Sequence, residues 1–471
     1  MRHHLPVCAA AACAAALAMA GFAGGTAAAA QETPPPPAPP SEQPLLHELV
    51  RAVSPERIER DVRTLVSFGT RHTLSSRTDP KRGIGAATRW IEEEFRRISA
   101  SCGGCLEVRR VAGVVGPAPR IPEPTEIVNV IAIQRGTLDP DRVVIMSGDI
   151  DSRVSDVMDA TSDSPGANDN ASGLAGTLEA ARVLSKHRFA GTIVYAALAG
   201  EEQGLYGGRI LAEHARDQGW RVKAVLNNDM IGNIAGIDGV IDNTTARVFS
   251  EGTRAVETPE EARIRRFTGG EVDSPSRNLA RYIDRLADRY IPNLDVMMIY
   301  RLDRFGRGGH HRPFNELGMP AVRIMEAHEN YTRQHQDVRV ENGIRYGDVI
   351  EGVDFAYAAK LTALNVVTLA SLASAPPFPA DVEIRGAVSP DTTLSWKLPQ
   401  GRAADNLAGY RVYWRLTDQP QWQWSRWVGL TDHATLKNIV IDNYFFGVAS
   451  VSKDGFESPV VFPGPAGSFG K

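Results

Sequence analysis

Cysteine is scarce in this sequence, with four residues among 471. So few cannot supply the disulfide framework that small secreted domains use in place of a large core. An excess of one charge is also lacking, because 52 basic residues face 56 acidic ones and leave a formal net charge of −4. That balance argues against a polyanionic partner, so we expect no nucleic-acid binding. After residue 30 no run of 18 uninterrupted apolar residues occurs, so we expect no stable membrane insertion.

The composition is that of a folded protein, with 43% hydrophobic and 23% charged residues. At about 150 residues per domain, the length of the chain predicts two or three domains.

Residues 1–30 are typical of a signal peptide. Arg2 supplies a positive charge, residues 7–20 are almost all Ala, Leu, Val and Met, and small residues continue to Ala30 in front of Gln31. We therefore expect a bacterial protein that is secreted or periplasmic. Residues 31–44 contain PPPPAPP and are expected to form a proline-rich linker.

Removal of the signal peptide leaves Cys102 and Cys105, in the sequence CGGC, as the remaining cysteines. A redox C-x-x-C pair normally begins a helix, whose dipole stabilises the thiolate. This pair instead follows an expected helix at 87–98 and precedes an expected strand at 106–108. In an oxidising compartment we interpret Cys102 and Cys105 as a small structural disulfide that closes a turn.

Strand-like and helix-like segments alternate between residues 45 and 374. Strands are expected at 128–133, 143–146, 192–199 and 222–226, and helices at 174–184, 205–215 and 353–372. This alternation predicts an α/β domain whose sheet is mostly parallel or mixed, with helices on both faces. Before it, residues 45–101 suggest two helices around a loop, and the polar, Arg-rich segment 233–300 suggests an insertion.

A second domain is expected at residues 379–465. The proline-rich sequence ASAPPFP at 373–379 ends the helical pattern, and the periodicity then becomes two. About ninety residues of short alternating strands predict a small all-β sandwich. The sequences LSW, GYRVYW and NYFFGVASVSKDGFES make it resemble fibronectin type III domains. Because a proline-rich hinge separates the two regions, we expect the α/β domain to fold without the sandwich.

Four motifs place carboxylates directly after strands or at helix entries. They are SGDIDSR at 147–153, PGANDNASG at 165–173, AGEEQGLYG at 199–207 and NNDMIGN at 227–233. In an open α/β sheet these points meet at the carboxyl ends of the strands, where ligands bind. The acidic residues that would gather there are Asp149, Asp151, Asp169, Glu201, Glu202 and Asp229. Since like charges at contact distance destabilise one another, divalent metal ions are the natural counter-charge.

These motifs resemble the co-catalytic zinc aminopeptidase family, which includes leucyl aminopeptidases, glutamate carboxypeptidases, glutaminyl cyclases and the transferrin receptor ectodomain. The resemblance covers residues 45–372 and implies a zinc exopeptidase-like fold, two divalent metal ions and a peptide substrate. It implies that Asp169 bridges both ions, that Glu201 is the general base and that Glu202 binds one metal. Asp229 would bind the other metal. The segments HHRPF, MPAVRIME and RQHQD resemble the late part of the family's site and make His335 the imidazole ligand.

One position departs from the family pattern. The family normally has His-x-Asp where this chain reads Asp149-Ile150-Asp151. A carboxylate can coordinate in place of imidazole, so we keep Asp149 as a metal ligand. In the family, the residue at the position of Asp151 has a catalytic role, because it orients this imidazole by accepting its ring N–H. Without the imidazole, the role of Asp151 is open. An oxygen-only site of Asp149, Asp169 and Asp229 would suit Mn²⁺, or Co²⁺ in its place, beside a firmer zinc site.

The resemblance favours a secreted metal-dependent aminopeptidase. His311 and the arginines around it are candidates for the substrate-binding side, and an arginine cluster could hold a substrate carboxylate. A carboxypeptidase and a glutaminyl cyclase with a single zinc ion therefore stay open as alternatives. An inactive binding ectodomain is a further alternative, since the usual histidine is missing and a β-sandwich has been added.

Overall fold

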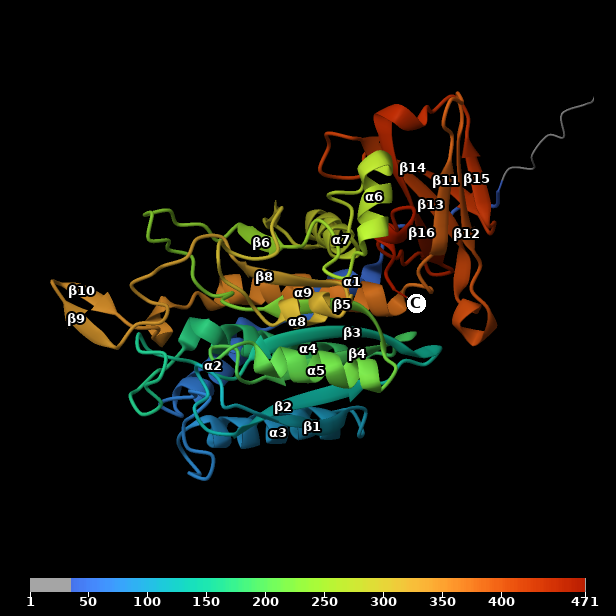
Figure 1. Cartoon of the computed structure of the whole chain (residues 1–471). Coiled ribbons are helices and arrows are strands. Elements are labelled where there is room, and N and C mark those ends of the chain that lie inside the picture. The colour runs from blue at the N-terminus through green and yellow to red at the C-terminus, as the bar shows by residue number, and fades with distance from the viewer. Residues whose placement is uncertain (1–34, 471) are drawn as a thin grey trace, which may run out of the picture. The chain divides into compact units, whose positions relative to one another are not determined.

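The computed structural model describes residues 35–470. The expected signal peptide and the first residues of the expected linker lie outside the described residues. One large sheet with helices on its faces is followed by smaller sheets toward the C-terminus (Figure 1).

The main sheet has eight strands in the order β1-β2-β4-β3-β5-β8-β6-β7. The four central strands β4, β3, β5 and β8 run parallel, whereas β2 and β6 pair antiparallel with their inner neighbours. This mixed sheet confirms the predicted fold class. The bounds in spatial order are β1 Glu107–Val115, β2 Thr125–Gln134, β4 Gly191–Leu198, β3 Asp139–Asp149, β5 Arg221–Asn228, β8 Ala321–Glu326, β6 Thr245–Phe249 and β7 Asp295–Ile299.

Both faces of the central strands are buried because helices cover them. Successive residues of β3 alternate between two apolar clusters, with Val144 and Met146 in one and Val143 and Ile145 in the other. This is why the central strands read as continuous apolar runs rather than as an alternation. The helices of the larger face are α1 Pro44–Ala52, α2 Pro55–Val66, α3 Ile84–Ser101, α4 Gly173–Leu184, α7 Pro275–Tyr290 and α9 Phe355–Ser374. The helices of the other face are α5 Tyr206–Asp217 and α8 His311–Glu316.

Helix α9 is apolar on all sides because it lies inside the domain. It is the one helix among the described residues that is long and apolar enough to cross a membrane. However, 78% of its most apolar window is buried against the rest of the protein. It is therefore a core helix, as expected for a helix without a polar face.

Two segments differ from the sequence-based expectation. Residues 45–101 form three helices rather than two. Segment 233–300 is not a simple insertion, because β6 and β7 extend the sheet and α7 buries one face against α9. Its polar, Arg-rich appearance arises partly from buried arginines, which the apolar periodicity does not register. Cys102 and Cys105 are disulfide-bonded in the turn after α3.

The C-terminal region consists of two three-stranded antiparallel sheets. Their orders are β11-β12-β15 and β14-β13-β16. The strand bounds are β11 Ala380–Arg385, β12 Thr392–Lys397, β13 Leu407–Leu416, β14 Trp424–Gly429, β15 His433–Leu436 and β16 Tyr444–Ser452. The remaining elements are helix α6 Pro259–Thr268 and the small hairpin of β9 Arg339–Glu341 and β10 Ile344–Tyr346. The all-β composition agrees with a small sandwich, while the fibronectin type III likeness stays a prediction.

The C-terminal sheets share a core with the α/β domain. One apolar cluster continues from Leu372 of α9 to Trp396 and Val448 of the two small sheets. Beside it, the buried carboxylate of Asp273 accepts from Arg281 of α7 at 2.9 Å and from Arg415 of β13 at 2.8 and 2.9 Å. The structure therefore does not support the expectation that the α/β domain folds alone, because the proline-rich segment adjoins a continuous interface.

We expect Asp273→Asn to lower the free energy of unfolding by about 3–5 kcal/mol, because it leaves two buried guanidinium groups without their counter-charge. Chemical denaturation of the whole chain measures this. Glu383→Gln, which breaks an exposed pair with Arg385, is the matched control and should cost less than about 1 kcal/mol. An equal, small effect of both substitutions would show that Asp273 does not hold the two regions together.

Candidate active site

The carboxylates singled out in the sequence gather where the central parallel strands end. Asp149 is the last residue of β3, Glu201 and Glu202 follow β4, and Asp229 follows β5. Asp169 lies in the turn that leads into α4, and His335 lies in the loop after β8. A cavity of about 500 Å³ has Asp169, Glu201, Glu202, Asp229 and His335 in its wall. Sequence reasoning thus placed five of these residues at one site.

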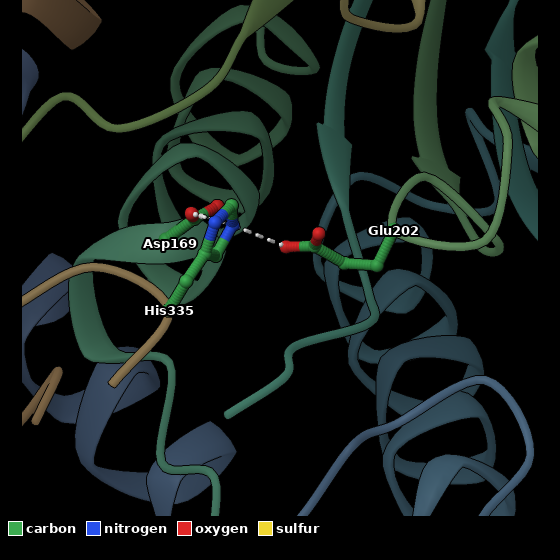
Figure 2. Close-up of side chains that lie close together, drawn as sticks. All are labelled: Asp169, Glu202 and His335. Carbon is green, nitrogen blue, oxygen red and sulfur yellow. Dashed lines mark hydrogen bonds and ion pairs between the residues drawn. The ribbon is translucent and has the colours of Figure 1, made fainter. Parts of the chain in front are cut away.

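Asp169, Glu202 and His335 form a tight cluster, drawn in Figure 2. Nε2 of His335 lies 2.9 Å from Oδ2 of Asp169 and 3.0 Å from Oε1 of Glu202. One donor atom of each residue lies within 4.8 Å of the others. Two carboxylate oxygens and one imidazole nitrogen are a donor set that suits zinc.

The charges of this cluster stabilise one another. Burial acts to raise the pKa values of Asp169 and Glu202, but His335, together with nearby arginines, outweighs burial, so that both pKa values are lowered. Burial acts to lower the pKa of His335, but Glu202 and Asp169 outweigh it and raise the pKa to about 9. A proton on Nε2 thus lies between two ionised carboxylates. A divalent cation at the same place would supply the same compensation with more charge.

The backbone around the cluster is held by two further buried carboxylates, Asp348 and Asp151. Asp348 accepts a hydrogen bond from the backbone N–H of Asp169 at 2.6 Å. Asp151 accepts from the backbone N–H groups of Glu201 and Glu202 at 3.2 and 3.0 Å. Asp151 therefore positions the Glu pair, which gives it a task without a histidine to orient. His335 itself has a φ of 54°, in the left-handed region that is uncommon outside glycine.

Asp149 has a different partner from the one expected in a metal site. Its Oδ1 lies 2.6 Å from Nδ1 of His310, and its Oδ2 accepts from Asn170 at 2.7 Å. Burial raises the pKa of Asp149 to about 8 and lowers that of His310 to about 4, so the pair shares one proton at neutral pH. A metal ion bound by Asp149 would first have to displace that proton. Sequence reasoning missed His310 because 161 residues separate the two partners.

Only one of the two carboxylate oxygens of Asp229 has a partner among the described residues. Its Oδ2 is paired with Arg323 at 2.6 Å, whereas its buried Oδ1 has no hydrogen-bond partner among the described residues. An orphaned carboxylate oxygen beside the cluster fits a second cation near Asp229. Arg323 was missed although it lies within the predicted strand MPAVRIME; a charged residue inside an apolar strand is the signal that pointed to it.

Glu201 lines the cavity next to the cluster. Burial raises its pKa well above the usual value, and the charges of Glu202, Asp229 and Asp149 raise it further. This shift favours the protonated form of Glu201, and a cation bound at the neighbouring cluster would oppose it and favour the carboxylate that a general base requires.

His311 does not lie where the sequence suggested. Its side chain is fully buried, Nε2 donates to the carbonyl oxygen of Leu302 at 2.8 Å, and Asp303 lies 3.6 Å away. Among the described residues that form the cavity wall, His311 is absent. It fixes the loop before α8, because a fully buried imidazole with these partners has no surface left for a substrate.

Zinc affinity should rise with pH, because the proton on Nε2 of His335 must leave before this nitrogen can bind a metal ion. Between pH 6 and 8 we expect the Kd for zinc to fall about tenfold per pH unit, since one proton is displaced below a pKa of about 9. Competition with a chromophoric chelator measures the Kd. His335→Asn should weaken binding and abolish this slope. A Kd independent of pH would mean that Arg153, whose guanidinium lies 2.6 Å from Nδ1, keeps the ring neutral.

We expect Asp149→His and His310→Asp each to lower the free energy of unfolding by about 3–5 kcal/mol, because each breaks the buried pair. The double exchange restores one imidazole and one carboxylate and should recover most of that loss. Denaturation and metal content of the four proteins measure the coupling. Exchanging the exposed pair Asp432 and His433 is the control and should change neither quantity. A double variant no better than the single ones would contradict the pairing.

Comparison with known proteins agrees with this geometry. The sequence model of peptidase family M28 matches residues 129–340 of this chain. A probable zinc metalloprotease of Leptosphaeria maculans is 45% identical over 421 residues, which are 89% of this chain and 97% of the relative. Another, of Pyricularia oryzae, is 46% identical over 418 residues, 88% of this chain and 83% of the relative.

The crystal structure of LapB from Legionella pneumophila is similar in fold. It has a TM-score of 0.51 and 19% identity, and the similarity covers 71% of this chain and 76% of LapB. With close relatives along most of its length and a matching family description, the chain belongs to peptidase family M28 and is a metallopeptidase.

Proposed function

We propose that this metallopeptidase is a zinc-dependent aminopeptidase that removes N-terminal residues from peptides. The cluster of Asp169, Glu202 and His335 with Glu201 beside it is the observation that carries the proposal. The names of the relatives support zinc, and the resemblance of the motifs to zinc aminopeptidases supports the direction of attack. The composition of residues 1–30 supports export to the periplasm or the medium as part of the same proposal.

The proposed reaction needs a metal ion at the cluster. Zinc held by Asp169, Glu202 and His335 would polarise the scissile carbonyl and make a water molecule more acidic. Glu201 accepts the proton of the attacking water and then donates it to the nitrogen of the leaving amine. Asp151 keeps the Glu pair in place through the two backbone N–H groups, so that Glu202 binds while Glu201 reaches the water.

A second ion belongs to the proposal as a weaker site. The free Oδ1 of Asp229 favours it, whereas the pairing of Asp149 with His310 and Asn170 disfavours it. We propose that this site exchanges its ion readily and accepts Mn²⁺ or Co²⁺, because oxygen donors suit harder ions than zinc.

Glu201→Gln should retain zinc and lower kcat by about 10²–10⁴, because an amide cannot accept the proton of water. Release of leucine from a leucyl peptide and zinc content by elemental analysis measure the two effects. Glu202→Gln is the matched control, since it alters the neighbouring carboxylate and should lose zinc as well as activity. Near-normal turnover of Glu201→Gln with full zinc content would overturn the proposed role. A protein that retains zinc but cleaves no peptide from its N-terminus would overturn the aminopeptidase assignment.

A further inference from the structure

The cavity above the metal cluster has a wall of arginines. Beside the metal-binding acids and Glu201, its charged lining consists of Glu316 and six guanidinium groups. The arginines are Arg120, Arg153, Arg209, Arg304, Arg307 and Arg312. Arg153 is already engaged, because Nε donates to Glu202 at 2.8 Å and its guanidinium contacts His335. The other five also line the cavity.

These arginines outnumber the carboxylates that hold them. Glu329 is shared by Arg247, Arg304 and Arg307, each at 3.0 Å. Glu316 is shared by Arg209 and Arg312 at 3.7 and 3.5 Å, distances beyond good hydrogen bonds. Four arginines of the wall, together with Arg247 outside it, therefore share these two carboxylates.

Other neighbours do not remove the excess charge. Asp303 lies 3.3 Å from Arg304 but is also paired with the buried Arg323. Gln334, oriented so that its amide oxygen faces Arg307, contributes only a neutral acceptor. Arg120 donates to the carbonyl oxygen of Glu202, which is likewise neutral. The wall retains net positive charge, and part of it is exposed, since the side chain of Arg307 is 32% accessible and that of Arg312 38%.

The cavity offers little to an apolar group. Among the described residues of its wall, Leu205 is the one with an apolar side chain, and the rest are charged side chains or glycines. A pocket that selects large apolar side chains would be lined mainly by apolar and aromatic residues. The chemistry of this wall instead matches a carboxylate, which arginine binds with two parallel N–H groups.

We propose that the arginine wall binds a substrate carboxylate next to the scissile bond, so that this enzyme prefers peptides with an anionic residue on the leaving side. The inference rests on the proposed function and names its substrate class. The positive wall repels an ammonium group. The free N-terminus of the substrate therefore lies toward the acidic floor of the cavity, which Asp169, Glu201, Glu202 and Asp229 form. The carboxylate has two sources, an acidic side chain or the free C-terminus of a dipeptide.

Three peptides separate these sources on the zinc-loaded enzyme. Leu-Glu-NH₂ against Leu-Gln-NH₂ tests the side-chain carboxylate, and Leu-Gln against Leu-Gln-NH₂ tests the α-carboxylate. We expect kcat/KM to differ about tenfold or more in at least one pair, and the difference to shrink as salt screens the wall. Ratios within twofold in both pairs would overturn the proposal.

Substitutions in the arginine wall test whether its arginines cause this preference for a carboxylate. Arg307→Gln leaves Glu329 with two arginines, and the double variant Arg307→Gln with Arg312→Gln weakens both halves of the wall. We expect the favoured ratio to fall at least fivefold in the double variant, with unchanged zinc content and melting temperature. Arg345→Gln, in the hairpin of β9 and β10, is the matched control and should keep the ratio. A ratio that survives in the double variant would overturn the assignment to this wall.

Binding distinguishes failure of this inference from failure of the proposed function. Analogues of the same peptides with the scissile amide reduced to a methylene-amine are titrated calorimetrically into the zinc-loaded protein. If no peptide is cleaved but the carboxylate analogue binds about tenfold more tightly, the aminopeptidase assignment fails and the arginine wall stands. If cleavage occurs with equal binding of both analogues, the wall fails and the aminopeptidase stands.

Discussion

The burial of several carboxyl groups around the carboxyl ends of the central parallel strands is the constraint on which the rest of the site depends. Asp149, Asp169, Glu202 and Asp229 are each 9% exposed or less. Carboxylates taken out of water are tolerated only with close compensation. The chain supplies it with His310, His335, Arg153 and Arg323, each within 2.9 Å of one of these carboxylates. The site is therefore assembled by protons and guanidinium groups of the chain, with which a metal ion has to compete.

The same constraint explains the role of the loop between α2 and α3, which carries Arg71 and for which the sequence predicted no catalytic or metal-binding residue. Arg71 is fully buried and donates to the carbonyl oxygens of Ile150, Pro165 and Gly166. These carbonyls lie in the two loops that carry Asp149 and Asp169, so one guanidinium group fixes the spacing between them. Its positive charge, close to Asp348, Asp151 and Asp169, also offsets part of their repulsion. The loop therefore positions the neighbouring loops and supplies a positive charge, and it provides no reacting group.

The sequence predicted the features that are local and missed those that depend on distant pairing. Strand ends followed by acidic motifs were enough to place Asp169, Glu201, Glu202 and Asp229 together, because parallel strands bring their carboxyl ends to one edge. The partner of Asp149 could not be predicted, because His310 lies in a loop whose position is set by packing of α8. The shared core with the C-terminal sheets was missed for the same reason, since a proline-rich segment looks alike whether it joins packed or separate domains.

The charge of the cavity changes from negative at its floor to positive at its wall. The floor is acidic and close to the strand ends, whereas the wall carries arginines that extend toward solvent. In such a cleft the low-dielectric surroundings focus the field, so an entering peptide is oriented before it makes contacts. Under the proposed function, an anionic group would meet the wall first, and the carbonyl beside it would then lie over the floor, near Glu201 and the cluster of Asp169, Glu202 and His335. In this proposal the wall and the floor act on neighbouring parts of one ligand, so that changing the wall changes which peptide is presented and leaves the proposed reacting groups in place.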